Sequence, residues 1–357
     1  MKIALLTPYY ASARGNAVTV RRIARGLRSS GVTAEVVDLS TTGPEPALAI
    51  LREFAPDLVH GFHAFRAGPL AARYAEEAGR PLVISLSGTD VNHDLFDGAR
   101  REAVVGVLRA ASAVVGFHET IREAVARALP DLAARLSVIP QSVALGDRPF
   151  PLGALVPLRP GEVRFLLPAG IRPVKNVSFP LAHLGELAGR YPIKFLVAGP
   201  VLDEEEGARL LRALKGCEWA SYLGEVPHEQ MGALLDAVDV VVNSSRSEGG
   251  MANAILEAMS RGKAVLASDI PGNRSIVVDG VDGLLFDSPE AFRSKAERLV
   301  RDAEFRRRLG EAAREKIERC YPPRRELAGY LDLYRRLLGS GPAVPGRAGA
   351  PGRGGAG

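Results

Sequence analysis

The fold is decided by residues 239–286, DVVVNSSRSEGGMANAILEAMSRGKAVLASDIPGNRSIVVDGVDGLLF. Three valines, Val240 to Val242, are followed by small polar residues and predict a buried parallel strand that enters a loop. Apolar residues at helical spacing between Ala254 and Met259 predict a helix. The run Ala264 to Ala267 predicts a second strand, ahead of a turn at Pro271-Gly272. A strand, a glycine loop, a helix and a strand make a right-handed βαβ crossover.

The glycine loop of this unit is suited to an anion. Gly249 and Gly250 let the backbone approach a ligand without a Cβ in the way. The free N–H groups and the dipole of the next helix favour negative charge in the same space. Glu248 and Glu257 would repel phosphate but accept hydrogen bonds, from a sugar and from a ribose respectively. A diphosphate between them gives the shape of a nucleotide-sugar. The alternative is an ordinary glycine turn with surface glutamates.

These residues resemble a known family. A glutamate, a glycine loop and a second glutamate in LEAM resemble the retaining GT-B glycosyltransferases of family four. That family has seven residues between the two glutamates, whereas eight separate Glu248 from Glu257. We assign the extra residue to the paired glycines, before the helix begins. The resemblance implies that the backbone of Gly249, Gly250 and Met251 holds phosphate and a sugar hydroxyl.

Composition sets the bounds for any function. The length of 357 residues predicts two domains, and 46% apolar with 24% charged residues is ordinary for a globular protein. The formal charge of +5 does not indicate a nucleic-acid partner. Two cysteines make neither a disulfide framework nor a metal site, and the six histidines show no metal spacing. We therefore expect no metal and no cofactor. With no membrane-length apolar run and no signal peptide, we expect a cytoplasmic location.

The chain opens as a Rossmann-type unit. A strand at 2–6, a loop at 7–16, a helix at 17–29 and a strand at 32–39 are expected. The single glycine of the loop, Gly15, is not the dinucleotide fingerprint. GNAVT resembles the first loop of the family, which closes over the gap between donor and acceptor. Gly15 is therefore a donor-side candidate and Asn16 an acceptor-side candidate.

Arginines gather around this first helix. A solvated basic face is the favoured interpretation, and contact with an anionic acceptor or a lipid surface is the alternative, without further support. The arginines are Arg14, Arg21, Arg22, Arg25 and Arg28.

Two polar clusters follow predicted strands, at the edge where parallel sheets bind ligands. The first is DLVHGFHAFRAG, residues 57–68. Its His60 lies inside the strand and is expected to be structural. His63 follows the strand, and the resemblance implies that it contacts the donor sugar. Arg66 is an acceptor-side candidate.

The second cluster is PLVISLSGTDVN, residues 81–92. Thr89 is an acceptor-side candidate, and Asp90 either orients an acceptor or holds a backbone turn. Together, GNAVT, HAFRAG, GTDVN and RPVKN resemble the small glycosyltransferase-one domain-containing branch of the family. They are also similar to the bacterial selenosugar synthases.

A proline-rich stretch at 147–161 marks the domain linker, because four prolines exclude a helix or a central strand. The second half opens with a strand at 163–167. Arg172 and Lys175 follow it, where two cations would face a diphosphate and neutralise the charge that grows as the sugar–oxygen bond breaks. The resembling enzymes use such a pair in place of a divalent metal.

We therefore predict an α/β protein of the GT-B type, with two Rossmann-like doubly wound parallel-sheet domains that face a cleft. The N-terminal, acceptor-binding domain would span residues 1–150 and the nucleotide-sugar domain 151–322. A helix at 323–338 carries an apolar stripe that must be buried, and the resemblance implies that it crosses back to the first domain. The Gly/Pro/Ala/Arg tail, 339–357, is expected to be disordered.

The predicted reaction is metal-independent transfer of a sugar from a nucleoside diphosphate, with UDP favoured, to an unidentified acceptor. The resemblance implies retention at the anomeric carbon, through attack on the same face as the leaving diphosphate. Three alternatives stay open. They are transfer to selenophosphate, epimerisation of a nucleotide-sugar without an acceptor, and non-catalytic binding of a nucleotide-sugar.

Overall fold

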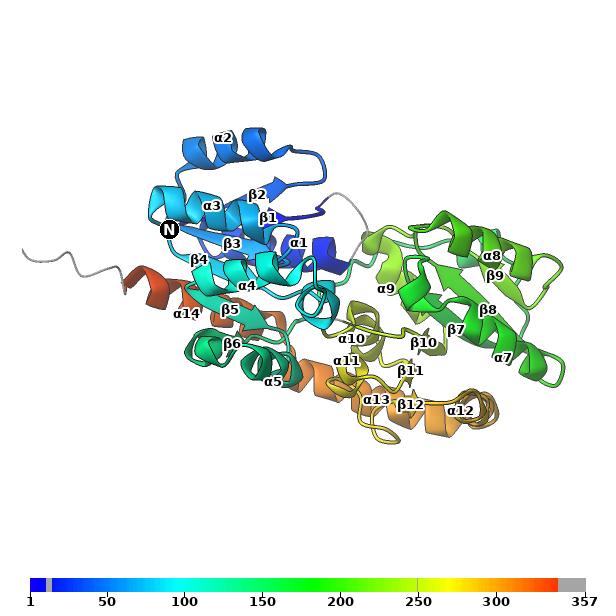
Figure 1. Cartoon of the computed structure of the whole chain (residues 1–357). Helices are drawn as coiled ribbons and strands as arrows, with labels where there is room; N and C mark the ends of the chain where they lie inside the picture. The colour runs from blue at the N-terminus through cyan, green and yellow to red at the C-terminus, as the bar shows by residue number, and fades with distance from the viewer. Residues whose placement is uncertain (11–14, 249, 340–357) are drawn as a thin grey trace, which may run out of the picture.

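The structure is a computed structural model that describes residues 1–10, 15–248 and 250–339. Two six-stranded sheets lie side by side, each with helices on both faces (Figure 1). Every strand pairing within them is parallel. The prediction of an α/β protein with two Rossmann-like doubly wound domains is confirmed.

The first half, blue to cyan in Figure 1, has the strand order β2-β1-β3-β4-β5-β6. Its strands are β1 (Lys2–Thr7), β2 (Thr33–Asp38), β3 (Leu58–Phe62), β4 (Leu82–Ser85), β5 (Ala113–Gly116) and β6 (Leu136–Val138). Its helices are α1 (Gly15–Ser29), α2 (Pro44–Phe54), α3 (Gly68–Ala78), α4 (Arg101–Ala110) and α5 (Glu119–Ala128). Two shorter turns are a π-helical one, η1 (Asp90–Asp94), and a 3-10 one, η2 (Pro130–Arg135). The strand order reverses between β1 and β3.

The second half, green to orange in Figure 1, has the strand order β12-β11-β10-β7-β8-β9. Its strands are β7 (Val163–Pro168), β8 (Ile193–Ala198), β9 (Ala220–Tyr222), β10 (Val240–Asn243), β11 (Ala264–Ser268) and β12 (Leu284–Phe286). Its helices are α7 (Ser178–Ala188), α8 (Glu204–Leu214), α9 (His228–Asp236), α10 (Asn253–Ser260), α11 (Pro271–Arg274), α12 (Pro289–Arg301) and α13 (Ala303–Cys320), with a 3-10 turn η3 (Pro173–Lys175). Here the strand order reverses between β7 and β10.

Both sheets are buried on both faces, which is why their strands are apolar runs rather than alternating patterns. Along β1, Ile3 and Leu5 pack into the cluster on one face, and Ala4 and Leu6 into the cluster on the other. All five positions of β3 are buried. Such sheets bind ligands beyond the carboxyl ends of their strands, at the point where the strand order reverses. The fold therefore directs attention to the loops after β1, β3, β7 and β10.

The last helix, α14 (Pro323–Gly339), returns to the first half of the chain (Figure 1). Tyr330, Leu333 and Tyr334 of α14 are buried in the same apolar cluster as Ile3 of β1 and Val20 of α1. The predicted crossing back is confirmed. Within α14, Leu333 is buried to 3% exposure, while Leu337 and Leu338 are only partly buried.

Several short elements of the structure differ from the sequence predictions. Strand β12 was not predicted, because its three residues are too few to show a period. The expected turn at Pro271-Gly272 is the first turn of the short helix α11. The proline-rich stretch holds a one-turn helix, α6 (Leu152–Leu155), and its Leu152 packs into the core of the second half. Residues 340–357, most of the predicted tail, lie outside the described residues.

Candidate functional site

A cavity of about 580 Å³ lies between the two halves. Its volume suits a ligand of the size of a nucleotide-sugar. The loops at both reversal points reach it, as the fold predicts. The first half contributes, among others, His63, Thr89, Asn92 and Gln141. The second half contributes, among others, Arg172, Lys175, Glu248, Gly250, Met251 and Glu257.

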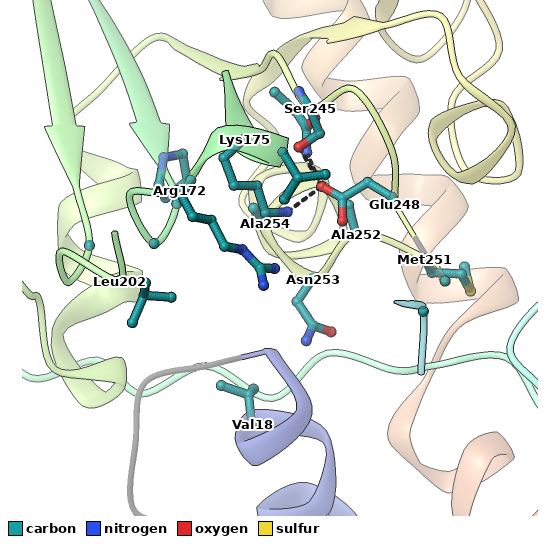
Figure 2. A pocket seen from close by; sticks show the side chains of 18 of the residues that line it. Val18, Arg172, Lys175, Leu202, Ser245, Glu248, Met251, Ala252, Asn253 and Ala254 are labelled. Atoms are coloured by element: carbon teal, nitrogen blue, oxygen red, sulfur yellow. Dashed lines mark hydrogen bonds and ion pairs between the residues drawn. The ribbon is translucent and has the colours of Figure 1, made fainter. Parts of the chain in front are cut away.

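Glu248 and Lys175 form an ion pair on the wall of the second half (Figure 2). Lys175 Nζ donates to Glu248 Oε1, which also accepts from Ser245 Oγ at 2.6 Å and from Asn243 Nδ2 at 3.2 Å. Burial raises the pKa of the Glu248 carboxyl, but the charge of Lys175 and these hydrogen bonds outweigh burial, and the net pKa is lowered. Glu248 is therefore a carboxylate that accepts hydrogen bonds.

Arg172 lies beside this pair. It precedes the turn η3, and its side chain extends into the cavity toward Lys175 and Asn253 in Figure 2. The two cations come from the loop after β7, and Glu248 comes from the loop after β10. The strand order reverses between these two strands, which brings together residues 73 positions apart in the sequence.

Glu257, on α10, is paired with a residue that the sequence did not single out. Its Oε1 accepts from Nε2 of His228 at 3.0 Å, and both residues line the cavity. His228 is the first residue of α9, and the sequence gives no reason to connect it with a helix almost thirty residues further on. Helix α10 begins at Asn253 without a side-chain cap, because residue 252 is alanine.

Gly250 packs against the first half of the chain. A methyl group on Gly250 would lie 2.9 Å from Cδ2 of Phe117, the residue that follows β5. On the other side, a methyl group on Gly272 would lie 2.8 Å from Cβ of Glu248. The loop is thus held between Phe117 and α11, so Gly250 is required for close packing and not only for approach to a ligand. Gly249 lies outside the described residues, and Met251 is buried at the cavity.

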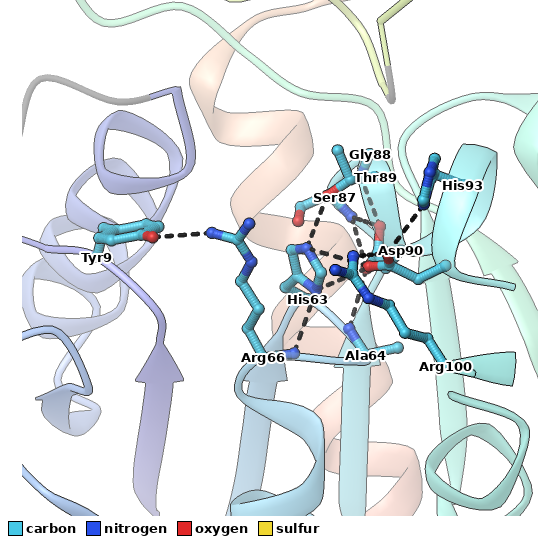
Figure 3. A network of polar contacts seen from close by, with 11 residues as sticks. Tyr9, His63, Ala64, Arg66, Ser87, Gly88, Thr89, Asp90, His93 and Arg100 are labelled. Carbon is cyan, nitrogen blue, oxygen red and sulfur yellow. Dashed lines mark hydrogen bonds and ion pairs between the residues drawn. The ribbon is translucent and has the colours of Figure 1, made fainter. Parts of the chain in front are cut away.

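His63 is the centre of a polar cluster in the first half (Figure 3). Its Nδ1 accepts from the Arg66 backbone N–H at 3.3 Å, so the ring hydrogen is on Nε2, which lies 2.8 Å from Thr89 Oγ1. Burial lowers the pKa of His63, with Asp90 opposing and Arg66 adding to the shift. The backbone of His63 has φ of +82°, a strained conformation that clusters at functional sites.

Asp90 holds a turn, which is one of its two predicted roles. Its buried carboxylate accepts from the backbone N–H groups of Ala64 at 3.0 Å and of Gly88 at 2.7 Å. These bonds fasten the loop after β3 to the loop after β4 (Figure 3). The cavity wall includes Thr89, whereas Asp90 lies behind it.

Arg66 is exposed and donates to Tyr9 Oη at 2.8 Å, and Tyr9 lines the cavity. Arg66 therefore lies one side chain away from the cavity. Gly15 and Asn16 start α1, and Val18 of the same turn lines the cavity (Figure 2). Arg14 lies outside the described residues.

His60 differs from His63 in its surroundings. It is fully buried, with Nδ1 at 2.6 Å from Tyr334 Oη and Nε2 at 2.8 Å from Ser85 Oγ. Burial lowers its pKa to about 3, so the ring is neutral at neutral pH. These contacts connect β3 to α14 and lie in the core.

Two further observations concern the described residues as a whole. No group of three or more His, Cys, Asp or Glu side chains among them is arranged to hold a metal ion. None of their helices combines the length and apolar character that a membrane crossing requires.

Comparisons with known proteins agree with this architecture. Residues 157–316 match the family described as "Glycosyl transferases group 1". Glycosyltransferase 1 domain-containing protein 1 of Xenopus tropicalis is 28% identical over 342 residues, which cover 92% of this chain and 96% of the relative. Alpha-D-kanosaminyltransferase of Streptomyces kanamyceticus is 28% identical over 192 residues, which cover 51% of this chain and 44% of the relative.

Two solved structures share the fold. Anabaena HepE in complex with UDP and glucose superimposes with a TM-score of 0.76 and 17% identity, covering 94% of this chain and 100% of HepE. Sucrose-phosphate synthase from Thermosynechococcus elongatus gives a TM-score of 0.78 and 18% identity, with coverage of 95% and 100%. At these identities the similarity shows the fold alone, which is the two-domain GT-B architecture.

Proposed function

From a group 1 glycosyltransferase domain at residues 157–316 and a GT-B fold, we propose that the protein transfers a sugar from a UDP-sugar to an acceptor, with retention and without a metal. One observation carries this proposal. A single cavity brings two cations, Arg172 and Lys175, together with two carboxylates, Glu248 and Glu257. The HepE structure, with the same fold, is in complex with UDP and glucose.

The diphosphate of the donor would lie against Arg172 and Lys175. As the bond between the anomeric carbon and the phosphate oxygen breaks, its electron pair goes to the diphosphate. The two cations stabilise the resulting charge, which is a larger effect in a closed cavity than in water. The acceptor oxygen attacks the same face of the sugar and gives its proton to the departing phosphate oxygen. Retention follows from this geometry.

Glu248 would hold the sugar. As a carboxylate it accepts hydrogen bonds from sugar hydroxyls, and its ion pair with Lys175 joins the sugar site to the phosphate site. Lys175 then serves two anions, Glu248 and the diphosphate. His63 faces the cavity from the other half and would contact the same sugar, together with Thr89.

Glu257 would bind the ribose. One of its oxygens already accepts from His228, and the other is available to the ribose hydroxyls. The backbone of the loop from Gly249 to Met251 would hold phosphate between the two glutamates. The carboxylates thus bind hydroxyl groups, and the cations bind phosphate.

A donor screen by thermal shift tests the proposal. UDP, GDP and ADP and their common sugars are added to the wild type, to Glu257→Ala and to a control, Glu290→Ala, whose side chain is exposed on α12. Binding raises the melting midpoint with ligand concentration. UDP and one UDP-sugar should stabilise the wild type and the control, and Glu257→Ala should lose this effect.

The preferred donor is then incubated with candidate acceptors, selenophosphate among them, with and without EDTA. NMR of the product reports the anomeric configuration. A retained glycoside formed in EDTA supports the proposal, and an epimerised donor formed without an acceptor would replace transfer by epimerisation. If no nucleotide or nucleotide-sugar stabilises the wild type, the proposal is wrong.

A further inference from the structure

Gln141 lines the cavity, and one of its polar atoms has no hydrogen-bond partner among the described residues. It follows β6 in the segment that leads to the second half, and it is only 4% exposed. Its Nε2 donates to Thr19 Oγ1 of α1 at 3.0 Å. Its carbonyl oxygen, Oε1, has no hydrogen-bond partner among the described residues.

A buried carbonyl without a partner is destabilising, and native proteins leave few of them. In a ligand cavity, such an oxygen accepts a hydrogen bond from the ligand. The position of Gln141 within the cavity therefore makes its Oε1 a binding group rather than a packing defect.

Thr19 orients the side chain of Gln141. Thr19 accepts from the Gln141 amide, and it also lies 3.5 Å from Nδ2 of Asn253, the first residue of α10. Figure 2 shows Asn253 opposite Val18, the neighbour of Thr19 on α1. Thr19 thus joins the first half, the connecting segment and the helix that carries Glu257. A side chain held in this way can position a ligand atom at the boundary between the two halves.

The surrounding wall indicates the kind of ligand. Besides the two histidines, the polar side chains that the described residues of the first half contribute are hydroxyls and amides, namely Tyr9, Ser87, Thr89, Asn92 and Gln141. Such groups exchange hydrogen bonds with hydroxyls, which are both donors and acceptors. In the proposed function the donor diphosphate lies against the other wall, so the acceptor faces this one.

We propose that Gln141 Oε1 accepts a hydrogen bond from a hydroxyl of the acceptor, and that the acceptor is a neutral polyol. This inference rests on the proposed function. It makes Gln141 an acceptor-binding residue and Thr19 a positioning residue.

The test uses the full chain saturated with UDP. Binding of glucose, myo-inositol and glycerol is measured by saturation-transfer NMR titration for the wild type, Gln141→Leu, Gln141→Glu and Thr19→Val. At least one polyol should bind the wild type, and Gln141→Leu should weaken that binding about three- to tenfold, the range for one neutral hydrogen bond. Gln141→Glu keeps an acceptor oxygen and should bind better than Gln141→Leu.

UDP affinity checks the fold of each variant. A purely structural role for Gln141 predicts equal losses in Gln141→Leu and Thr19→Val, because both break the same contact, and this result would overturn the inference. Failure of all three polyols to bind the UDP-loaded wild type would also overturn it, while leaving the proposed function intact. Failure of UDP itself to bind would overturn both.

Discussion

Arg22 of α1 and Glu326 of α14 lie 304 positions apart and form a bidentate ion pair, with Nε–Oε2 and Nη2–Oε1 distances of 2.7 and 2.8 Å. Both side chains are buried, at 8% and 3% exposure. Ser142 donates to Glu326 Oε2 at 2.5 Å. The pair therefore joins the first helix, the last helix and the segment that connects the two halves.

Removing Glu326 should destabilise the protein strongly. In Glu326→Ala, the Arg22 guanidinium stays buried without a counter-charge, which costs about 3–5 kcal/mol. The control is Glu304→Ala, whose ion pair with Arg307 is exposed and contributes about 0–1 kcal/mol. Urea unfolding measures both. Equal midpoints for the two variants would show that α14 is held in place without this pair.

Gly250 and Phe117 should be energetically coupled. Gly250→Ala places a methyl group against the Phe117 ring, and such overpacking costs about 1–3 kcal/mol. Phe117→Ala removes the ring, so Gly250→Ala should cost little in that background. A double-mutant cycle of unfolding free energies measures the coupling.

Gly106→Ala is the matched control for this cycle. Gly106 is in α4, and a methyl group there has no neighbour within 4 Å. The substitution should stabilise the protein by up to about 1 kcal/mol through helix propensity. If Gly250→Ala, with Phe117 present, destabilises the protein no more than Gly106→Ala does, the loop is not held against the first half.

Most of the fold could be predicted because the sequence shows two physical patterns. Strands buried on both faces are continuous apolar runs, and surface helices have helical periodicity. β1 and α1 begin and end within two residues of the predicted ranges, 2–6 and 17–29. The three-residue strand β12 is too short to show either pattern, and the π-helical turn η1 arises from the backbone bonds to Asp90.

The sequence predicted the individual residues of the candidate site but not the contacts between them. Local pattern placed Arg172, Lys175, Glu248 and Glu257 after strands or on a helix near the cavity. It did not predict that Lys175 pairs with Glu248, because periodicity identifies the buried face of an element and not the partner it meets. The same reason explains why Gln141 was missed, since its partner Thr19 lies 122 positions away.

Stability should fall as the pH falls from 6.5 toward 5. Burial lowers the pKa of His60 to about 3 and that of His118 to about 4. Below pH 6.5 the unfolded chain binds protons at both rings and the folded chain does not, so each contributes a loss of up to about 1.4 kcal/mol per pH unit. Above pH 6.5 the two rings are neutral in the folded and the unfolded chain, so this loss of stability is absent.

The measurement is the free energy of unfolding at several pH values within this window. In His60→Gln the free energy of unfolding should fall less steeply with falling pH, because one of the two proton-binding rings is missing. This expectation holds even if the variant is less stable than the wild type. His93→Gln is the control, since the His93 side chain is 64% exposed. An unchanged slope in His60→Gln would mean that His60 is protonated in the folded protein.

Lys175 and Glu248 should affect different parts of the donor. Lys175→Met removes one of the two cations that would face the diphosphate, so the binding of UDP itself should weaken by about 1.5–3 kcal/mol. Glu248→Gln releases Lys175 from its ion pair, so UDP should bind at least as tightly as to wild type, while the additional affinity of the preferred UDP-sugar is lost. Calorimetry with both ligands separates these effects.

Lys263→Met is the control for the loss of one positive charge. Lys263 Nζ donates to the Asp236 carbonyl at the protein surface. Its UDP affinity should equal that of wild type. If Glu248→Gln weakens UDP and the UDP-sugar equally, Glu248 acts on the diphosphate through Lys175, and the sugar is held by other groups.

Glu257 should distinguish ribose from deoxyribose. His228 holds one carboxylate oxygen of Glu257, so the other oxygen has a fixed direction. In the proposed function this second oxygen would accept a hydrogen bond from a ribose hydroxyl. Loss of a charge-assisted hydrogen bond costs about 1.5–3 kcal/mol, so 2′-deoxy-UDP or 3′-deoxy-UDP should bind the wild type at least about tenfold more weakly than UDP. Glu257→Gln should bind UDP and that analogue nearly equally.

His228→Gln separates position from charge. Its Glu257 carboxylate is intact but is held less firmly, so discrimination between UDP and the deoxy analogue should be reduced rather than abolished. Full discrimination in His228→Gln would show that α10 alone orients Glu257. Full discrimination in Glu257→Gln would place the ribose elsewhere in the cavity, and the orientation of the donor would then have to be reversed relative to Glu248.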